Sequence, residues 1–440
     1  MIARHRSGGY ASVAATRRAF LVLTALRWLP TGLLMPTLVL YLTSAGLNLA
    51  EVGFVTALQG GMILLLELPT GGLADAWGRC PVLAGAAVAS IASIATLLAA
   101  DTIALFGLAF ALQGVYRALD SGPLNSWYVD AALAVDPARN LERDLAQAGS
   151  VLYAAVATGS LLASGLTVLD MLPIDPLAAA LVAALVCEVL HLAAVLVLLR
   201  EVRPHRGFAA AHTAIVQAPR VIAASVRLGW SRRSLRLLLA VELSWGAGLC
   251  ALELLWQPRT QSELAGPQQA WVFGTMSAAA WITGAAGAAL LPLLIRILNR
   301  RVTWTAALLR IVQGATLVTL GLAWGLAGVI VGYVAFYTVH GAANPAHEAL
   351  LHRRVTTGHR STVLSLNSLV MRASSLPAGI LFGVLADHSG PSVALVTAGL
   401  LLTTAAPLYL LSGEPPANPT QDPSMRHPST KQASTNPPAD

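Results

Sequence analysis

Long apolar stretches alternate with short polar ones along almost the whole chain. An α-helix needs about 20 residues to cross a hydrocarbon core of about 30 Å. Twelve stretches reach that length: residues 20–42, 51–70, 81–100, 102–125, 146–169, 176–199, 235–256, 270–295, 303–323, 325–347, 361–386 and 391–411. The pattern predicts an all-α integral membrane protein with twelve transmembrane helices.

The basic residues predict how these helices are oriented. With the N-terminus inside, 23 of the 28 Lys and Arg residues fall on the inner side, and only Arg259 falls in an outer loop. The other four lie within predicted helices: Arg27, Arg117, Arg310 and Arg372. Because basic residues accumulate in cytoplasmic loops, both termini are expected in the cytoplasm. Lys431 is the only lysine, and this preference for Arg is typical of GC-rich bacterial genomes, so the bacterial inner (plasma) membrane is the expected location.

The composition and motifs of the chain argue against several functional classes. The chain is 56% hydrophobic and 11% charged, whereas a soluble domain has about 25% charged residues. The net charge of +7 lies mostly in short loops, so it predicts no nucleic-acid partner. No phosphate-binding loop is present. No catalytic constellation and no cysteine or histidine spacing suited to a metal is present either, so no enzyme activity, cofactor or metal is predicted.

A long basic segment divides the helices into two blocks of six. The expected organisation is a cytoplasmic N-terminus (1–19), an N-terminal bundle (20–199), a basic cytoplasmic linker (200–234), a C-terminal bundle (235–411) and a disordered cytoplasmic tail (412–440). An amphipathic stretch near 208–230 either lies on the inner leaflet or is simply part of the linker. The two blocks resemble each other weakly, for example around Gly149-Ser150-Val151 and Asn367-Ser368-Leu369. Parallel repeats of six predict two pseudo-symmetric bundles with a site between them.

One motif is specific. The predicted loop between the second and third helices reads Gly71-Gly72-Leu73-Ala74-Asp75-Ala76-Trp77-Gly78-Arg79. It resembles the signature G-x-L-A-D-x-x-G-R of the major facilitator superfamily, with Cys80 in place of the final basic residue. The resemblance implies the major facilitator fold, and a gating cluster made of Gly71, Asp75, Gly78 and Arg79 that latches the two bundles together.

Charged residues within the helices are the next candidates, because an ionisable group at the bilayer centre costs about 2.5–3.5 kcal/mol on insertion scales. Arg27 and Asp120 lie at similar depths, so we expect them to pair, either to gate the protein or only to pack it. This would leave Arg117 facing water or Glu67. Arg27, Glu67, Arg117 and Asp120 are therefore candidates for proton coupling or gating.

The helices expected to line the central cavity carry aromatic and charged side chains. The substrate-cavity candidates are Trp28, Tyr116, Trp245, Glu253, Tyr337 and His340. This mixture is typical of a site for an amphipathic organic molecule. The predicted function is a secondary active transporter that works by alternating access, as a proton antiporter that exports an amphipathic drug-like or secondary-metabolite compound. It is expected to need no cofactor and to be a monomer in the lipid bilayer. The alternatives are uptake of a small metabolite by proton symport, and a membrane sensor or scaffold that transports nothing.

Overall fold

The structure is a computed structural model of the whole chain. It describes residues 12–169, 174–201, 232–266, 271–298, 301–355 and 360–413, with Ala223, Val226, Arg227, Gly229 and Trp230. Most of the predicted linker, its amphipathic stretch and nearly all of the predicted tail lie outside the described residues.

The described elements are all helices. In chain order they are α1 (Val13–Leu34), α2 (Leu38–Ser44), α3 (Leu49–Trp77), α4 (Arg79–Ala99), α5 (Ile103–Asp120), α6 (Pro123–Val135), α7 (Leu141–Leu169), α8 (Pro176–Leu198), α10 (Arg233–Gln261), α11 (Trp271–Ile297), α12 (Val302–Leu322), α13 (Gly325–His352), α14 (Arg360–Ser389), α15 (Pro391–Thr404) and α16 (Ala406–Leu411). Within the described ranges eleven spans are long and apolar enough to cross a membrane, or twelve when α1 and α2, which meet at 41°, count as one.

Several helices are longer than the apolar stretches that predicted them. Helix α1 begins at Val13, seven residues earlier than expected, because the Ser12 side chain caps its first turn. The span predicted at 102–125 continues through α6 to Val135 and breaks at Gly122, whose φ of +94° favours glycine. Helix α3 continues to Trp77, so most of the motif predicted as a loop is helical, and only Gly78, with φ of +99°, breaks the chain there.

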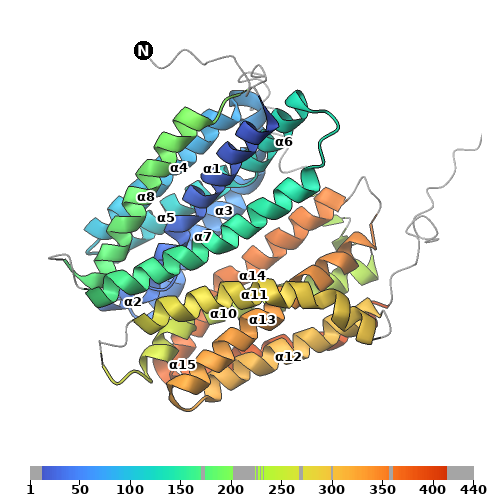
Figure 1. Cartoon of the computed structure of the whole chain (residues 1–440). Coiled ribbons are helices and arrows are strands. Elements are labelled where there is room, and N and C mark those ends of the chain that lie inside the picture. The colour runs from blue at the N-terminus through green and yellow to red at the C-terminus, as the bar shows by residue number, and fades with distance from the viewer. Residues whose placement is uncertain are drawn as a thin grey trace, which may run out of the picture.

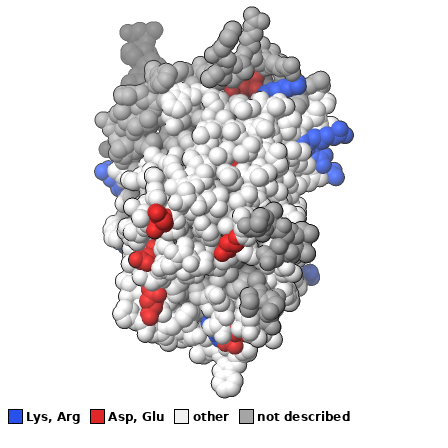
Figure 2. Space-filling model, turned by 90° about the vertical axis from the view of Figure 1, so that its left-hand side faces the viewer, with Lys and Arg blue, Asp and Glu red and all other residues white. Residues whose placement is uncertain are grey.

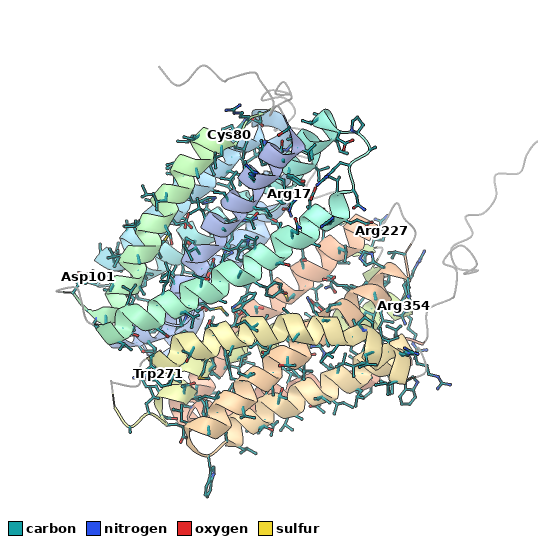
Figure 3. The ribbon with its side chains drawn as sticks, in the orientation of Figure 1. Arg17, Cys80, Asp101, Arg227, Trp271 and Arg354 are labelled. Atoms are coloured by element: carbon teal, nitrogen blue, oxygen red, sulfur yellow. The ribbon has the colours of Figure 1, made fainter. Side chains whose placement is uncertain are left out.

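The two ends of the molecule differ in charge. We call the end that carries Gly78 and the start of α10 the motif end, and the end that carries Gly46 and Gly390 the far end. Figure 3 places Arg227 and Arg354 toward the right of the view, at the motif end, and Asp101 and Trp271 at the left, at the far end. Figure 2 looks at that left-hand side, where several acidic side chains stand on a described surface that is otherwise largely uncharged.

The helices form two bundles, α1–α8 and α10–α16 (Figure 1). They meet along two antiparallel pairs, α3 with α14 and α7 with α11. Each pair joins the second span of one half to the fifth span of the other, as pseudo-twofold symmetry requires. Glycines allow the close approach: a Cβ on Gly53 would lie 2.1 Å from the Gly379 carbonyl oxygen, and one on Gly274 would lie 2.1 Å from that of Ser160.

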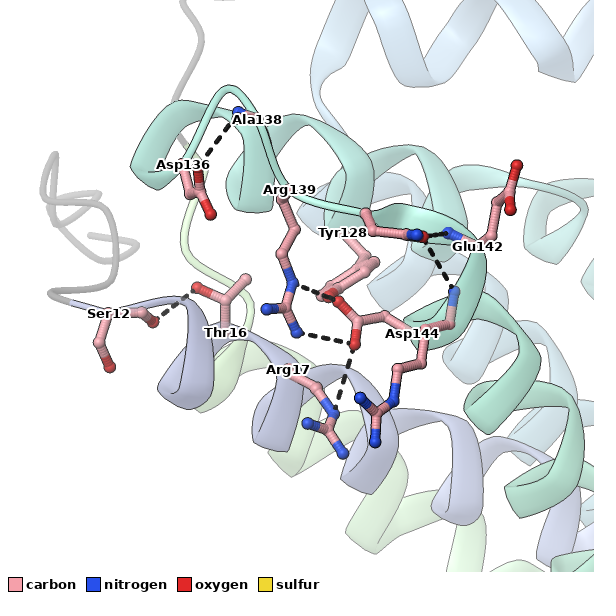
Figure 4. Close-up of polar contacts among 11 residues, drawn as sticks. Ser12, Thr16, Arg17, Tyr128, Asp136, Ala138, Arg139, Glu142 and Asp144 are labelled. Carbon is pink, nitrogen blue, oxygen red and sulfur yellow. Dashed lines mark hydrogen bonds and ion pairs between the residues drawn. The ribbon is translucent and has the colours of Figure 1, made fainter.

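A buried carboxylate holds the motif end of the first bundle together (Figure 4). Asp144 of α7 accepts two hydrogen bonds from Arg139, at 2.9 and 3.0 Å, and one from the Tyr128 hydroxyl at 2.5 Å. Arg17 of α1 lies 3.6 Å from the same carboxylate. Because Asp144 is completely buried, these donors replace its hydration and tie α1, α6 and α7 to one another.

Candidate functional site

A cavity of about 500 Å³ lies between the two bundles. Its wall is largely apolar, with side chains such as Leu34, Phe110 and Leu254. Its polar lining comes from both bundles: Thr31, Thr56, Gln59, Ser90, Ser93, Gln113, Tyr116, Arg117, Glu188, Glu253, Gln257, Arg372 and Ser375. An apolar pocket of this size with a few polar groups is typical of a site for a small organic molecule.

The predicted pairing of Arg27 with Asp120 is confirmed. The Arg27 Nε atom lies 2.5 Å from Asp120 Oδ2, and a terminal guanidinium nitrogen donates to the Asp120 carbonyl oxygen at 3.1 Å. Asp120 is the last residue of α5, so its carbonyl has lost its helical partner. Thr70 of α3 satisfies a second carbonyl at this end, that of Ala118, at 2.9 Å. The pair therefore ties α1 to the point where α5 breaks.

Arg117 lies in the cavity wall without an acidic partner among the described residues. Its guanidinium donates to Thr31 Oγ1 at 3.3 Å. It also lies 5.5 Å from the ring centroids of both Trp28 and Tyr116. Trp28 has Arg27 at 5.3 Å as well, so two cations share one indole ring. Of the two expected surroundings of Arg117, water or Glu67, the contact with Glu67 is absent among the described residues, because Glu67 pairs with Arg372.

Glu67 instead pairs with the opposite bundle. Its carboxylate lies 3.3 Å from Nε of Arg372, which lines the cavity from α14. Both side chains are partly accessible, at 25% and 30%. Since the pair crosses from α3 to α14, it must lengthen or break if the two bundles separate at this point.

The motif residues lie at the boundary between α3 and α4. Arg79 forms an ion pair with Asp130 of α6 at 2.6 Å, and its backbone N–H donates to Glu201. Gly78 makes the turn, whereas Gly71 lies within α3. The side chain of Asp75 lies outside the described part of the structure. The described contacts of Arg79 thus hold the first bundle together at its motif end.

The sequence-predicted cavity residues divide into two groups. Trp28, Tyr116 and Glu253 line the cavity. Trp245, Tyr337 and His340 are not among its lining residues and stack within the second bundle instead, which places the Trp245 and His340 rings 4.7 Å apart. Trp245 of α10 thus packs against His340 of α13, inside the second bundle.

A buried polar network lies beneath this stack, and sequence reasoning missed it as a unit. His347 Nε2 lies 3.3 Å from the Glu242 carboxylate and 3.1 Å from Asn367 Oδ1, and its Nδ1 lies 2.9 Å from the Tyr409 hydroxyl. Arg310 contacts Tyr409 at 3.3 Å and lies 5.0 Å from the Trp245 ring. Glu242, Arg310 and His347 are each at most 3% exposed.

The bundles are sealed to each other at the far end. The side chain of Gln257 fills the break between α1 and α2, where it donates to the Met35 carbonyl at 2.7 Å and accepts from the Leu40 N–H at 3.1 Å. Asp387 of α14 caps the start of α3 by accepting from the Leu49 and Ala50 N–H groups, at 3.0 and 2.8 Å. Each of these hydrogen bonds joins a residue of one bundle to a residue of the other. Together they close the cavity on this side.

We expect Asp387→Asn to favour opening of the far end, because it removes a negative charge from the N-terminus of α3. A helix cap contributes about 0.5–2 kcal/mol, so the ratio of open to closed molecules should rise severalfold. Distances between spin labels at Ala45 and Gln261, in a background without cysteine, would measure the shift. Asp175→Asn is the matched control, since Asp175 caps α8 within a single bundle. Equal distance distributions in wild type and Asp387→Asn would show that the contact of Asp387 with the start of α3 does not hold the far end closed.

Comparison with known proteins identifies the fold. No family model and no curated protein matches the chain. Two crystal structures of the nucleoside transporter NupG, one of them a substituted form, align with TM-scores of 0.74 at 12% identity over 90–91% of this chain and 98–100% of theirs. The human organic anion transporter MFSD10 (TETRAN) aligns with a TM-score of 0.58 at 15% identity over 91% of this chain and all of its own.

These likenesses agree with the two pseudo-symmetric bundles described above. The chain has the fold of the major facilitator transporters, as the motif at Gly71–Arg79 predicted. At 12–15% identity the comparison concerns the fold and leaves the substrate to be inferred from the cavity.

Proposed function

We propose that this protein is a secondary active transporter that moves a small organic molecule across the membrane by alternating access. The observation that carries the proposal is the cavity itself, which both bundles line and which the far-end contacts close on one side. A rocking motion of the bundles about such a site exposes it to the two sides in turn. The motif end, rich in Arg, is the proposed cytoplasmic side.

The ion pairs support a gating role at the motif end of the cavity. Glu67–Arg372 spans the two bundles, and Arg27–Asp120 fixes the break between α5 and α6. We assign gating to these two pairs. The motif residues Gly71, Asp75, Gly78 and Arg79 are assigned to the same closure by their resemblance to the family signature.

Protons are the proposed coupling ion, and the structure offers more than one buried acid to carry them. Asp120 is bound to a guanidinium, and Glu242 shares a buried network with His347. Export of an amphipathic drug-like or secondary-metabolite compound remains the first proposal for direction. Similarity in fold to a nucleoside transporter supports testing uptake of a small polar metabolite as the second.

Transport driven by a proton gradient tests the proposal directly. Inverted membrane vesicles containing the protein should accumulate members of a panel of amphipathic compounds when the gradient is imposed. Right-side-out vesicles would be given the same panel together with nucleosides, and accumulation there would establish uptake instead. Absence of transport in either orientation, from protein shown to be folded, would contradict the proposed function and favour a sensor or scaffold.

Ala57→Trp tests whether the substrate passes through this cavity. Ala57 lines the cavity, and an indole ring at this position would occupy much of its volume. We expect transport to be lost while the protein remains folded, as judged by a monodisperse profile in detergent. Unchanged transport by Ala57→Trp would show that the substrate passes elsewhere.

A further inference from the structure

We propose that the cavity binds an amphoteric organic molecule, one that carries both a carboxylate-like anion and an ammonium-like cation on an apolar scaffold. The anion would bind Arg117 in the first bundle, and the cation would bind Glu253 in the second. This inference rests on the proposed transport function for its biological meaning, but the binding site it describes can be tested without transport.

The first observation is that the two charges are unpaired. Glu253 of α10 has no hydrogen bond or ion pair among the described residues, and its side chain is exposed to the cavity. Arg117 has only Thr31 and two aromatic rings around its guanidinium. Arg117 acts on Glu253 electrostatically, but neither group has a salt-bridge partner among the described residues, so each favours a ligand that brings the opposite charge into contact with it.

The second observation is that the other charges of the cavity wall already have partners. Arg372 pairs with Glu67 at 3.3 Å. Glu188 accepts from the Ser90 hydroxyl at 2.9 Å and lies 3.3 Å from His191. Among the described lining residues, therefore, one cation and one anion remain available, and they come from opposite bundles.

The remaining lining fits the uncharged part of such a molecule. Trp28, Phe110 and Trp281 supply aromatic surface, and the Oε1 atom of Gln113 is buried without a hydrogen-bond partner. A ligand donor that reaches Gln113 would satisfy it. A molecule with only one charge would leave either Arg117 or Glu253 uncompensated, whereas a molecule with both would bridge the bundles.

Binding to the purified full-length protein tests the proposal with a matched series of compounds. The probes are para-(aminoalkyl)benzoic acids of increasing chain length, their methyl esters, which keep only the amine, and para-alkylbenzoic acids, which keep only the carboxylate. The readout is stabilisation against thermal unfolding as a function of ligand concentration. We expect the doubly charged compounds to bind at least about tenfold more tightly than either singly charged set, because each of the two charges in the cavity wall then has its partner.

Two variants should change selectivity rather than only weaken binding. Glu253→Gln should bind the carboxylate-only compounds and the doubly charged compounds with equal affinity. Arg117→Gln should bind the amine-only esters and the doubly charged compounds with equal affinity. Glu142→Gln is the control, since Glu142 lies in the first turn of α7 and is not part of the cavity lining, and it should keep the wild-type preference. A variant that fails to fold would show no cooperative thermal unfolding transition, so the same measurement identifies it.

The outcomes separate this inference from the transport proposal. Equal binding of singly and doubly charged probes by the wild type, or an equal loss for all probes in both variants, would overturn the amphoteric site even if transport is observed. Charge-selective binding by protein that transports none of the probes would support the site and count against the transport function.

Discussion

Asp120→Asn should lower the stability of the protein by about 3 kcal/mol, because it leaves the guanidinium of Arg27 buried without its counter-charge. Asp120 is 1% exposed and the Arg27 side chain is 15% exposed, so little water is available to replace the pair. The loss should appear as a lower midpoint of thermal unfolding in detergent. Transport should also be lost, since the pair fixes the end of α5 where that helix breaks.

A double variant separates packing from function at this pair. Arg27→Gln with Asp120→Asn removes both charges and should recover most of the lost stability, since an uncharged pair of similar size can still form a hydrogen bond. If stability returns but transport does not, the charges act in gating or coupling. If both return, the pair only packs α1 against α5. Asp120→Asn with wild-type stability would contradict the buried ion pair itself.

The pairing of Arg27 with Asp120 could be predicted because depth in a membrane is readable from sequence. Two opposite charges at the same distance from one membrane surface, on helices of the same bundle, have few other partners. The same reasoning left the partner of Glu67 open. Arg372 lies on a helix of the other bundle, and the contact between them depends on how the two bundles meet.

Helix ends were predicted less well, for a physical reason. Hydropathy detects the part of a helix that crosses the hydrocarbon, whereas α3 and α6 continue beyond it, to Trp77 and Val135. Helix α6 is held there by contacts such as the ion pair between its Asp130 and Arg79 of α4. Such contacts join segments far apart in the chain, and no local pattern reveals them.

The buried network of the second bundle escaped sequence analysis because its members lie on five different helices. Each looked like an isolated polar position among apolar residues. One signal was available: Glu242, Trp245 and Glu253 lie on one face of α10 at helical spacing. His340 and His347 lie two turns apart on α13 in the same way. Two polar stripes facing each other would have predicted a shared site.

Glu242→Gln should abolish accumulation of substrate against its gradient while leaving exchange of substrate between the two sides of the membrane. Exchange requires only that the loaded transporter reorient, whereas accumulation requires that a proton bind and leave in each cycle. Glu242 and His347 are the acid and base of the buried network, 3.3 Å apart, so one proton can be held between them. Reconstituted vesicles, assayed with and without an imposed proton gradient, would measure both activities.

The position of this pair is the reason to expect a larger effect here than at Glu188 and His191. Those two residues lie on one helix, three positions apart, so a proton there changes contacts within α8 and with Ser90. Glu242 and His347 join α10 to α13, and Asn367 and Tyr409 extend the network to α14 and α16. Arg310 supplies a permanent positive charge that repels a proton bound by this pair. Glu348 of α13 and Arg354 after it are the other charged groups that act on the pair. Unchanged accumulation in Glu242→Gln, or an equal loss in Glu188→Gln, would reject the network as the site of coupling.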